Sequence, residues 1–558
     1  MATYGDRWDA FIQNKAIFAA LGLVTHGLLN NSEPDYKFYA IIPLWVQLFT
    51  FATLVEYFVG SASQSFLAAV FLVTSAAAAY FGTFIASVLI YRAFFHRLRK
   101  FPGPFLARLS KLYAVHVTLN GPYYEEIERL HREHGAFVRT GPRELSIADS
   151  DAIPLLNGPQ ARVIKGPWYD HSKHIEGAAL HTTRDKAEHR MKRKDWDRAL
   201  GASSLREYSP RINRHTTELI SQLSSRIEKG EGDNLRMSDW MSFYSGDVIG
   251  DIGFSREFGM IREGKRAKLI QKLHDSMPAV SILYHLPWVI GLITRTGAEA
   301  GAKGLFEFMH WAREALKERK KVCALPSLNE PQEKDIMSFL LEEDDPDIPQ
   351  DRNADARIII VAGMDTTAST LTFLMYELCK NPDIQLKLRE EVQRVAGERS
   401  FLDVDDLTNI QYLEDVVNET LRLHPAASSG VQRETPPEGL NVNGTYIPGK
   451  ILTWMPMYTL HRSAAYFPQP LTFIPERWSS QPDLIQNKQA FMPFLTGPHK
   501  CVGWQLAIRE LRSVTANMLL NFEIGFVDGD TGESVESEAR DCFATISGPL
   551  DVRLRPLK

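Results

Sequence analysis

The 558-residue chain is 44% hydrophobic and 10% aromatic, so it can bury a large core, and its length alone allows several domains. Its formal net charge of -5, without a sustained stripe of Lys and Arg, argues against a nucleic-acid-binding protein. The four cysteines form no CxxC pair or other zinc spacing, which indicates neither a disulfide scaffold nor a zinc site and fits a reducing compartment.

Apolar runs mark the first hundred residues. Phe38 to Val55 and Phe66 to Ile90 are uncharged and long enough to cross a bilayer, so each predicts a transmembrane helix. Ala16 to Leu29 is shorter and carries His26, so it either lies in the interface or completes a third span. The runs are too many and too long for a cleavable signal peptide.

A basic cluster and a stiff hinge follow the last run. Basic residues at the exit of a span favour the cytoplasmic side, which places the rest of the chain in the cytosol. Pro102-Gly103-Pro104 then predicts the hinge. We expect a membrane anchor over residues 1–100 and a catalytic domain over 101–558, with the N-terminus in the cytosol for two spans and in the lumen for three. The cluster consists of Arg92, His96, Arg97, Arg99 and Lys100.

Residues 101–558 contain no repeat or low-complexity tract and predict one helix-rich domain with a few short strands. Within it, Ala356 to Lys380 has the pattern of a long apolar helix, interrupted by Gly363 and by Asp365-Thr366-Thr367. A mid-helix glycine costs about 1 kcal/mol relative to alanine. A threonine hydroxyl can bond back to the carbonyl four residues earlier and open the helix. Taken alone, the segment fits a core helix as well as a functional one.

Two charged motifs come next. Glu419 and Arg422 are neighbours on one predicted helix. Such a pair is common on surfaces and contributes little there. The segment Phe473-Ile474-Pro475-Glu476-Arg477-Trp478 follows downstream.

Cys501 lies in Phe494-Leu495-Thr496-Gly497-Pro498-His499-Lys500-Cys501-Val502-Gly503. The two glycines predict a tight turn that presents one sulfur from a backbone able to approach a large flat group. An amphipathic helix is predicted from Val502, and a helix N-terminus favours a thiolate over a thiol. The alternative is a buried structural cysteine, the more common fate of an isolated Cys.

The Cys501 segment resembles the haem-binding loop of the cytochrome P-450 family, Phe-x-x-Gly-x-Arg/His-x-Cys-x-Gly. The resemblance implies the mainly α fold of that family with a small β portion, preceded here by N-terminal transmembrane helices. It also implies that Cys501 is the axial thiolate of a haem iron, in a loop formed with Phe494, Gly497 and Gly503. The hinge is similar to that of microsomal members, which implies an anchor in the endoplasmic reticulum membrane.

The interrupted helix matches the family's Ala/Gly-Gly-x-Asp/Glu-Thr-Thr/Ser segment. By resemblance, Asp365 and Thr366 are the acid and alcohol that relay protons for dioxygen activation. Ala362 and Gly363 would leave room for dioxygen and substrate.

The segment around Arg477 resembles the family's Pro-Glu-Arg-Phe/Trp motif. The resemblance implies that Arg477 is buried against Glu419 and Arg422 in a structural charge triad. Because three buried charges are costly unless each is paired, loss of one is expected to be severe.

By the same resemblance, cationic side chains contact the haem propionates. Arg433 looks like one such ligand, and His499 takes a position where Arg is commonest. His189 and Arg193 match a Trp-x-x-x-Arg segment with His in place of Trp, while Trp196 lies in the wrong register to replace that Trp.

The function implied is a membrane-anchored monooxygenase that inserts one oxygen atom from dioxygen into a hydrophobic small molecule. The cofactor implied is haem b, iron protoporphyrin IX. No GxGxxG precedes a helix, so electrons from NADPH are expected through a separate NADPH-cytochrome P-450 reductase. An acidic partner would dock by charge complementarity on a basic patch. The expected patch comprises Lys192, Arg193, Lys194, Arg198 and Lys500.

Two other classes stay open. Haem-thiolate isomerases and dehydratases share the fold without using dioxygen, but typically lack the acid and alcohol pair. A non-enzymatic membrane receptor, transporter or haem protein would explain the anchor. It would not explain both the Cys501 loop and the interrupted helix with Asp365 and Thr366.

The segments Leu156-Asn157-Gly158-Pro159 and Lys165 to Asp170 are similar to those of fungal secondary-metabolism members, such as tryprostatin hydroxylase-like enzymes. Substrate walls are expected from Trp168 and its loop, from Val361 and Ala362, and from the segments Ala426 to Val431 and Ala544 to Ser547.

Overall fold

The computed structural model describes residues 4–30, 38–60, 65–170, 177–289, 303–323, 334–342 and 352–557. The chain divides into two compact units. The smaller unit comprises Met1–Tyr113, Arg139–Arg143 and Leu286–Ala298, and the larger unit comprises the remainder. Each unit is described by itself.

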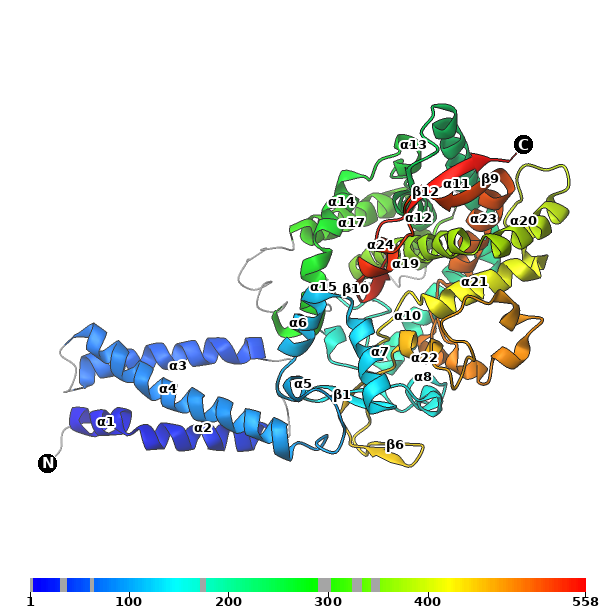
Figure 1. Cartoon of the computed structure of the whole chain (residues 1–558). Helices are drawn as coiled ribbons and strands as arrows, with labels where there is room; N and C mark the ends of the chain where they lie inside the picture. Colours follow the sequence, from blue (N-terminus) through cyan, green and yellow to red (C-terminus); the bar gives the residue numbers. More distant parts are fainter. Residues whose placement is uncertain are drawn as a thin grey trace. The chain divides into compact units, whose positions relative to one another are not determined.

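In the smaller unit, helices α2, α3 and α4 lie side by side (Figure 1). Gly22 of α2 allows close approach, because a Cβ there would lie 2.5 Å from Thr83 Oγ1 of α4. His26 Nδ1 also lies 2.6 Å from Ser87 Oγ. The segment predicted as interfacial or spanning therefore packs along α4. The helices are α1 (Tyr4–Gln13), α2 (Lys15–Leu29), α3 (Phe38–Val59), α4 (Phe66–Ile90) and α5 (Phe105–Leu109), with a π-helix at Tyr91–Phe95 after α4.

Ile41–Val59 and Phe66–Phe95 are long and apolar enough to cross a membrane, and most of each window is uncovered by protein. Asn353–Lys380 also has that length and composition, but most of it is buried within the protein. An apolar helix buried on all sides is a core helix. The two runs at the N-terminus are therefore the membrane candidates among the described residues.

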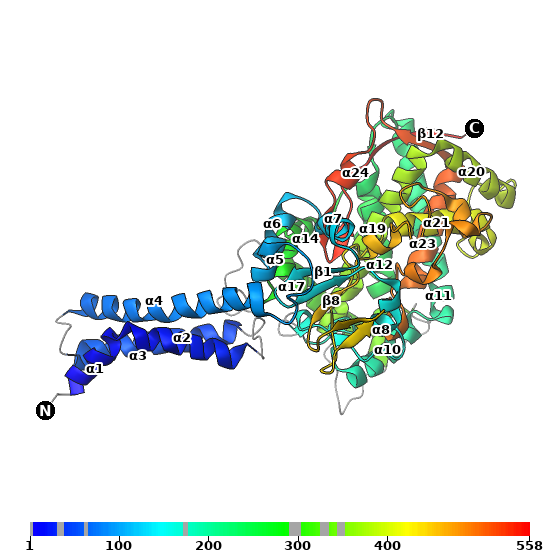
Figure 2. The same ribbon diagram turned by 60° about the horizontal axis from the view of Figure 1, so that its bottom comes forward.

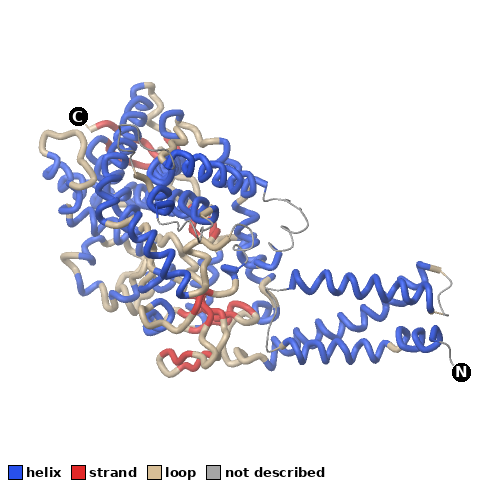
Figure 3. The backbone as a smooth tube through the Cα atoms, turned by 180° about the vertical axis from the view of Figure 1, so that it is seen from behind, coloured by secondary structure: helices blue, strands red, loops and turns tan. Residues whose placement is uncertain are grey.

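Helices dominate the larger unit, and its strands form small separate groups (Figure 3). Helix α6 (Leu112–Asn120) and strand β1 (Phe137–Gly141) each contain residues of both units. The other helices are α7 (Tyr123–His134), α8 (Ile153–Asn157), α10 (Lys186–Ala199), α11 (Ala202–Glu228), α12 (Met237–Phe254), α13 (Met260–Glu263), α14 (Lys268–Asp275), α15 (Met277–His285), α17 (Lys303–Cys323), α18 (Ile336–Glu342), α19 (Asn353–Lys380), α20 (Pro382–Ala396), α21 (Gln411–Leu423), α22 (Met457–His461), α23 (Trp504–Asn521) and α24 (Ser534–Ser537).

The strands pair in the orders β2-β8-β5-β3, β4-β12-β9, β6-β7 and β10-β11. β2 runs parallel to β8, whereas the other pairs within these groups are antiparallel. Their bounds are β2 (Glu144–Ile147), β3 (Ile164–Lys165), β4 (Leu235–Arg236), β5 (Arg433–Glu434), β6 (Leu440–Val442), β7 (Thr445–Ile447), β8 (Leu452–Trp454), β9 (Phe522–Phe526), β10 (Arg540–Cys542), β11 (Ala544–Ile546) and β12 (Asp551–Pro556).

The core of the larger unit is built around α19, which packs against α12, α21 and α23 (Figure 2). Its contact with α12 depends on glycine. A Cβ at Gly363 would lie 2.5 Å from the Ile249 side chain, and one at Gly253 would lie 2.6 Å from Ile359. The backbones of α12 and α19 therefore approach where each helix lacks a side chain.

Candidate active site

A cavity of about 330 Å³ lies inside the larger unit, between α19 on one side and the Cys501 loop with α23 on the other. This volume is within the range of roughly 300–1,000 Å³ typical of small-molecule sites. The cavity is lined mainly by apolar side chains, which is also typical of such sites. Cys501 and Thr366 both border it.

The loop before α23 holds Cys501 by backbone contacts. The Cys501 N–H donates to the Phe494 carbonyl at 2.8 Å, which closes the turn. Gly497 adopts a φ of +66°, and a Cβ there would lie 2.2 Å from the Asn157 carbonyl oxygen. A Cβ at Gly503 would meet nothing within 4 Å, although Gly503 borders the cavity. The first glycine is thus required by the fold, and the second leaves open space beside the sulfur.

Burial raises the pKa of the Cys501 thiol, and the backbone N–H groups of Gly503 and Trp504 oppose that rise. The sequence pattern alone predicts that the helix N-terminus favours the thiolate. In the protein by itself, desolvation outweighs that effect. Coordination to a metal would deprotonate the thiol outright.

Opposite Cys501, α19 presents Ala362, Gly363 and Thr366 to the cavity. The Thr366 hydroxyl donates to the Ala362 carbonyl at 2.6 Å, the back-bond expected from the sequence, and α19 stays α-helical there. Asp365 does not border the cavity. Its Oδ1 lies 3.0 Å from His274 Nε2 on α14.

Basic side chains line one end of the cavity. Lys165, His189, Arg193, Arg433 and His499 all border it, and His499 Nδ1 lies 3.1 Å from His189 Nε2. Burial, followed by the neighbouring cations, lowers the pKa of His189 to about 4 and that of His499 to about 2. Burial and two arginines hold the pKa of Lys165 well below its usual range. The two arginines therefore concentrate positive charge at this end of the cavity, and the neutral histidines add hydrogen-bonding groups that an anionic ligand could contact.

Two buried N–H donors that belong to cavity-lining residues, Arg433 Nε and Trp196 Nε1, have no hydrogen-bond partner among the described residues. The ring nitrogen His181 Nδ1 has none there either. Among the described lining residues, the only carboxyl belongs to Glu510, and burial raises its pKa well above the usual range. Unpaired buried donors are costly, so an acceptor is expected here. These residues fit a flat ligand whose anionic substituents would meet the basic side chains and whose iron would be held by the Cys501 sulfur.

Trp196 also lines the cavity, although its position in the sequence does not match the Trp of the family's Trp-x-x-x-Arg segment. His189, Arg193 and Trp196 are spaced i, i+4 and i+7 on α10, so they share one helix face. This spacing, visible in the sequence, could have indicated that Trp196 lies beside His189 and Arg193. Arg193 itself donates to the Lys500 carbonyl at 2.5 Å and pairs with Asp197 at 2.7 Å.

Beside the cavity, Glu419, Arg422 and Arg477 form a fully buried triad. Arg422 lies 2.8 Å and Arg477 lies 2.9 Å from Glu419 Oε1. The indole N–H of Trp478 donates to Glu419 Oε2 at 3.0 Å. Backbone carbonyls accept from both guanidinium groups, including those of His461 and Leu484. Each charged group therefore has hydrogen-bond partners, although the two guanidinium groups share one carboxylate.

A family model described as Cytochrome P450 matches residues 102–552. The chain belongs to the cytochrome P-450 family. It is 36% identical over 543 residues to the cytochrome P450 monooxygenase FCK2 of Fusarium pseudograminearum, with 95% of each chain covered. It is 35% identical over 478 residues to the cytochrome P450 monooxygenase orf5 of Eupenicillium brefeldianum, covering 85% of this chain and 94% of that one. Against tryprostatin B 6-hydroxylase of Neosartorya fischeri it is 32% identical over 466 residues, covering 82% of each.

Membership of the cytochrome P-450 family identifies this protein as a haem-thiolate monooxygenase, an oxidoreductase. The predicted fold, mainly α with N-terminal apolar helices, is confirmed. The relatives named above are monooxygenases or a hydroxylase, which favours this class over isomerases, dehydratases and non-enzymatic membrane proteins.

Phe543 forms a part of the cavity wall that the sequence analysis did not predict. Phe543, between β10 and β11, borders the cavity at a φ of +75°, a conformation that bulky residues rarely adopt. Its ring stacks on Trp168 with centroids 5.3 Å apart. Ala362 and Ala544 line the cavity as expected, but Trp168, Val361 and residues 545–547 do not border it, and Trp168 instead contacts the lining residue Phe543. Of the segment Ala426 to Val431, residues Ala426, Ala427 and Val431 line it.

The expected basic patch is smaller in the structure. Lys192 is buried, and Arg198 pairs with Glu342 at 3.1 Å. Lys194 is exposed, and the Lys500 ammonium lies 3.7 Å from the centre of the Trp504 ring. Lys192 was misassigned because the sequence does not reveal which face of α10 turns inward.

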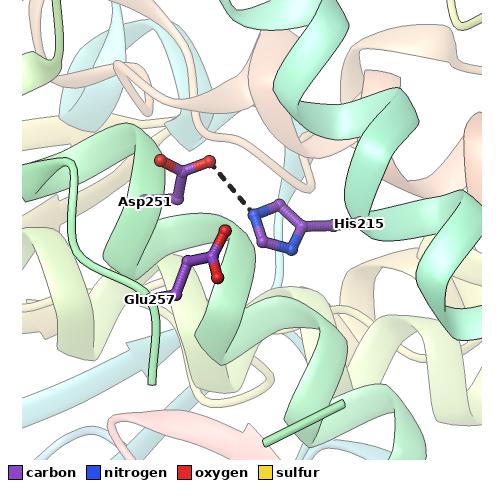
Figure 4. A group of neighbouring side chains, drawn as sticks. All are labelled: His215, Asp251 and Glu257. Carbon is purple, nitrogen blue, oxygen red and sulfur yellow. Dashed lines mark hydrogen bonds and ion pairs between the residues drawn. The ribbon is translucent and has the colours of Figure 1, made fainter. Parts of the chain in front are cut away.

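Within the described residues, one other group has metal-ligand geometry: His215, Asp251 and Glu257 (Figure 4). Arg214 lies 2.7 Å from Asp251 and 3.0 Å from Glu257. Burial opposes ionisation of Asp251, but the His215 hydrogen bond and the arginines lower its pKa overall. The arginines already neutralise these carboxylates, so the group is an ion-pair network.

Proposed function

We propose that the Cys501 thiolate would hold the iron of haem b in this monooxygenase. The observation that carries the proposal is the position of the Cys501 sulfur and the Thr366 hydroxyl on the walls of one cavity. When bound, the haem supplies the dioxygen chemistry, and the protein orients substrate and delivers protons. A thiolate-type spectrum of the reduced, carbon-monoxide-bound protein, together with NADPH-dependent product formation, tests this proposal.

Arg433, Arg193, His189 and His499 are proposed to contact the propionates, with Trp196 as a further donor. The unpaired Arg433 Nε and Trp196 Nε1 support this assignment, because both are buried N–H donors beside the cavity. The carboxylates of the propionates would also offset the repulsion between the two arginines.

Thr366 and Asp365 are proposed to deliver protons for oxygen activation. Thr366 borders the cavity, so its hydroxyl can hydrogen-bond to a group bound there. Asp365, the adjacent residue, is buried and paired with His274, so a carboxyl–imidazole pair lies one position along α19 from the alcohol. Gly363 keeps α12 close to α19, and Ala362 keeps the wall beside Thr366 small.

Thr366→Val keeps the shape of the side chain and removes only the hydroxyl. Haem content and substrate binding should survive, while reduced dioxygen should leave as hydrogen peroxide. General acid catalysis typically contributes about 10²–10⁴ in rate, so the loss of product should be large. The measurement is product and peroxide formed per NADPH. The matched control is Thr372→Val, because Thr372 makes the same back-bond, to Ala368, but does not border the cavity. Tight coupling in Thr366→Val would refute the proton role.

Electrons are proposed to come from NADPH through a separate cytochrome P-450 reductase. The exposed Lys194 and the partly exposed Lys500 lie on segments that border the cavity from the Cys501 side, so they offer positive charge to an acidic partner.

The anchor is proposed to hold the enzyme in the endoplasmic reticulum membrane with its catalytic domain in the cytosol. The basic residues after α4 support that orientation. The full chain should resist extraction by carbonate and by high salt, because α3 and α4 are apolar over a bilayer's thickness. A version starting near Phe101 should still bind haem. Release of the full chain by salt would contradict the membrane assignment.

The proposed substrate is a hydrophobic secondary metabolite. Two observations support it: the apolar wall formed by Ala362, Ala544 and Phe543, and the name of a relative that hydroxylates tryprostatin B. Comparing metabolites of a strain with and without this gene tests the proposal, and a hydrophobic compound should accumulate when the gene is absent.

A further inference from the structure

Asp365 is separated from the cavity that its neighbour Thr366 borders. Its carboxyl points to α14, where Oδ1 lies 3.0 Å from His274 Nε2. The Asp365 side chain is 7% exposed and that of His274 is 16% exposed. The imidazole therefore contacts both the buried carboxyl and the surface.

We propose that His274 passes protons from solvent to Asp365, as a positioning residue for the monooxygenase reaction. The inference rests on the proposed proton role of Asp365. Besides Thr366, α19 lines the cavity with the hydroxyls of Thr367 and Thr370, which can pass a proton but do not gain one from solvent, whereas Ala362, Ala426, Val431 and Ala544 are apolar. The pair on α14 and α19 therefore offers a route for protons that these wall residues do not provide.

The transfer balances without any other reactant. The imidazole gains a proton from water at Nδ1 and releases the Nε2 proton to Asp365 Oδ1, so one proton moves inward and no electrons move. The ring exchanges its remaining proton with solvent and regains its first tautomer. The protonated carboxyl then turns about its side-chain bonds toward the Thr366 hydroxyl.

His274→Gln separates the relay from a merely structural contact. A Gln amide can donate a hydrogen bond to Asp365, but it cannot bind and release protons. The control is His310→Gln, the same change at an exposed histidine on α17. The probe is NADPH oxidation by the full-length holoenzyme with reductase and no organic substrate, in which reduced dioxygen leaves as water or as peroxide.

We expect the ratio of peroxide to water to rise about tenfold or more in His274→Gln, since water can replace only part of the 10²–10⁴ of general acid catalysis. The solvent deuterium isotope effect on NADPH oxidation should change as well. His310→Gln should match the parent in both. An infrared carboxyl band identified by its loss in Asp365→Asn should shift in His274→Gln, which reports the pairing independently of turnover.

Each outcome discriminates. If Asp365→Asn raises peroxide but His274→Gln matches the parent, the relay is wrong and the role of Asp365 stands. If Asp365→Asn itself matches the parent, both fail. If His274→Gln loses haem, the double variant His274→Gln/Asp365→Asn is measured in its place, because it has no buried charge at this pair. The double variant must then equal Asp365→Asn, because both residues act in one path, and an additive effect would overturn the relay.

Discussion

Cys501→Ser should abolish the thiolate-type Soret band of the carbon-monoxide complex and reduce turnover to background. The change replaces a soft anionic sulfur by a neutral oxygen, which is a poor ligand for haem iron and does not promote cleavage of the dioxygen bond. The loop should keep its geometry, because its closing hydrogen bond uses the Cys501 backbone N–H. The measurements are the reduced, carbon-monoxide-bound spectrum and product formed per haem.

Cys323→Ser is the matched control, because Cys323 is exposed and does not border the cavity. It should retain both spectrum and turnover. If Cys501→Ser retained both, another residue would hold the iron, and the buried Cys379 and Cys542 would be tested next.

Glu419→Ala should yield little or no haem-loaded protein. Glu419 is the only carboxylate within the triad and contacts Arg422, Arg477 and the Trp478 indole. Its removal leaves two buried guanidinium groups without a counter-charge, a change that typically costs about 3–5 kcal/mol. Because native domains are stable by only about 5–15 kcal/mol, much of the stability would be lost. The measurements are haem per polypeptide and the midpoint of thermal unfolding.

Glu414→Ala on the same helix is the control. Glu414 pairs with Arg512 at the partly exposed surface, where a salt bridge contributes about 0–1 kcal/mol. Normal haem loading in Glu419→Ala would mean that the backbone carbonyls around the two arginines suffice to stabilise them.

Local patterns predicted the features whose physics is local. The hydrogen bond that closes the Cys501 turn joins two residues of the same short segment, and the apolar lengths of α3 and α4 are visible in the chain itself. The contact between Glu419 and Arg422 needs only helical spacing. Arg477 was placed beside them by resemblance, because nothing local brings it across the intervening chain.

Packing decided the rest. Whether Lys192 is buried, whether Trp196 borders the cavity, and whether Asp365 turns to His274 all depend on which neighbour covers each helix face. Phe543 shows the same limit, because its positive φ follows from the stack with Trp168 and the strands on either side. Spacing along the chain determines which residues share a face, but the free energy of burying that face depends on segments distant in sequence. The pKa values of Cys501 and of the histidines follow burial for the same reason.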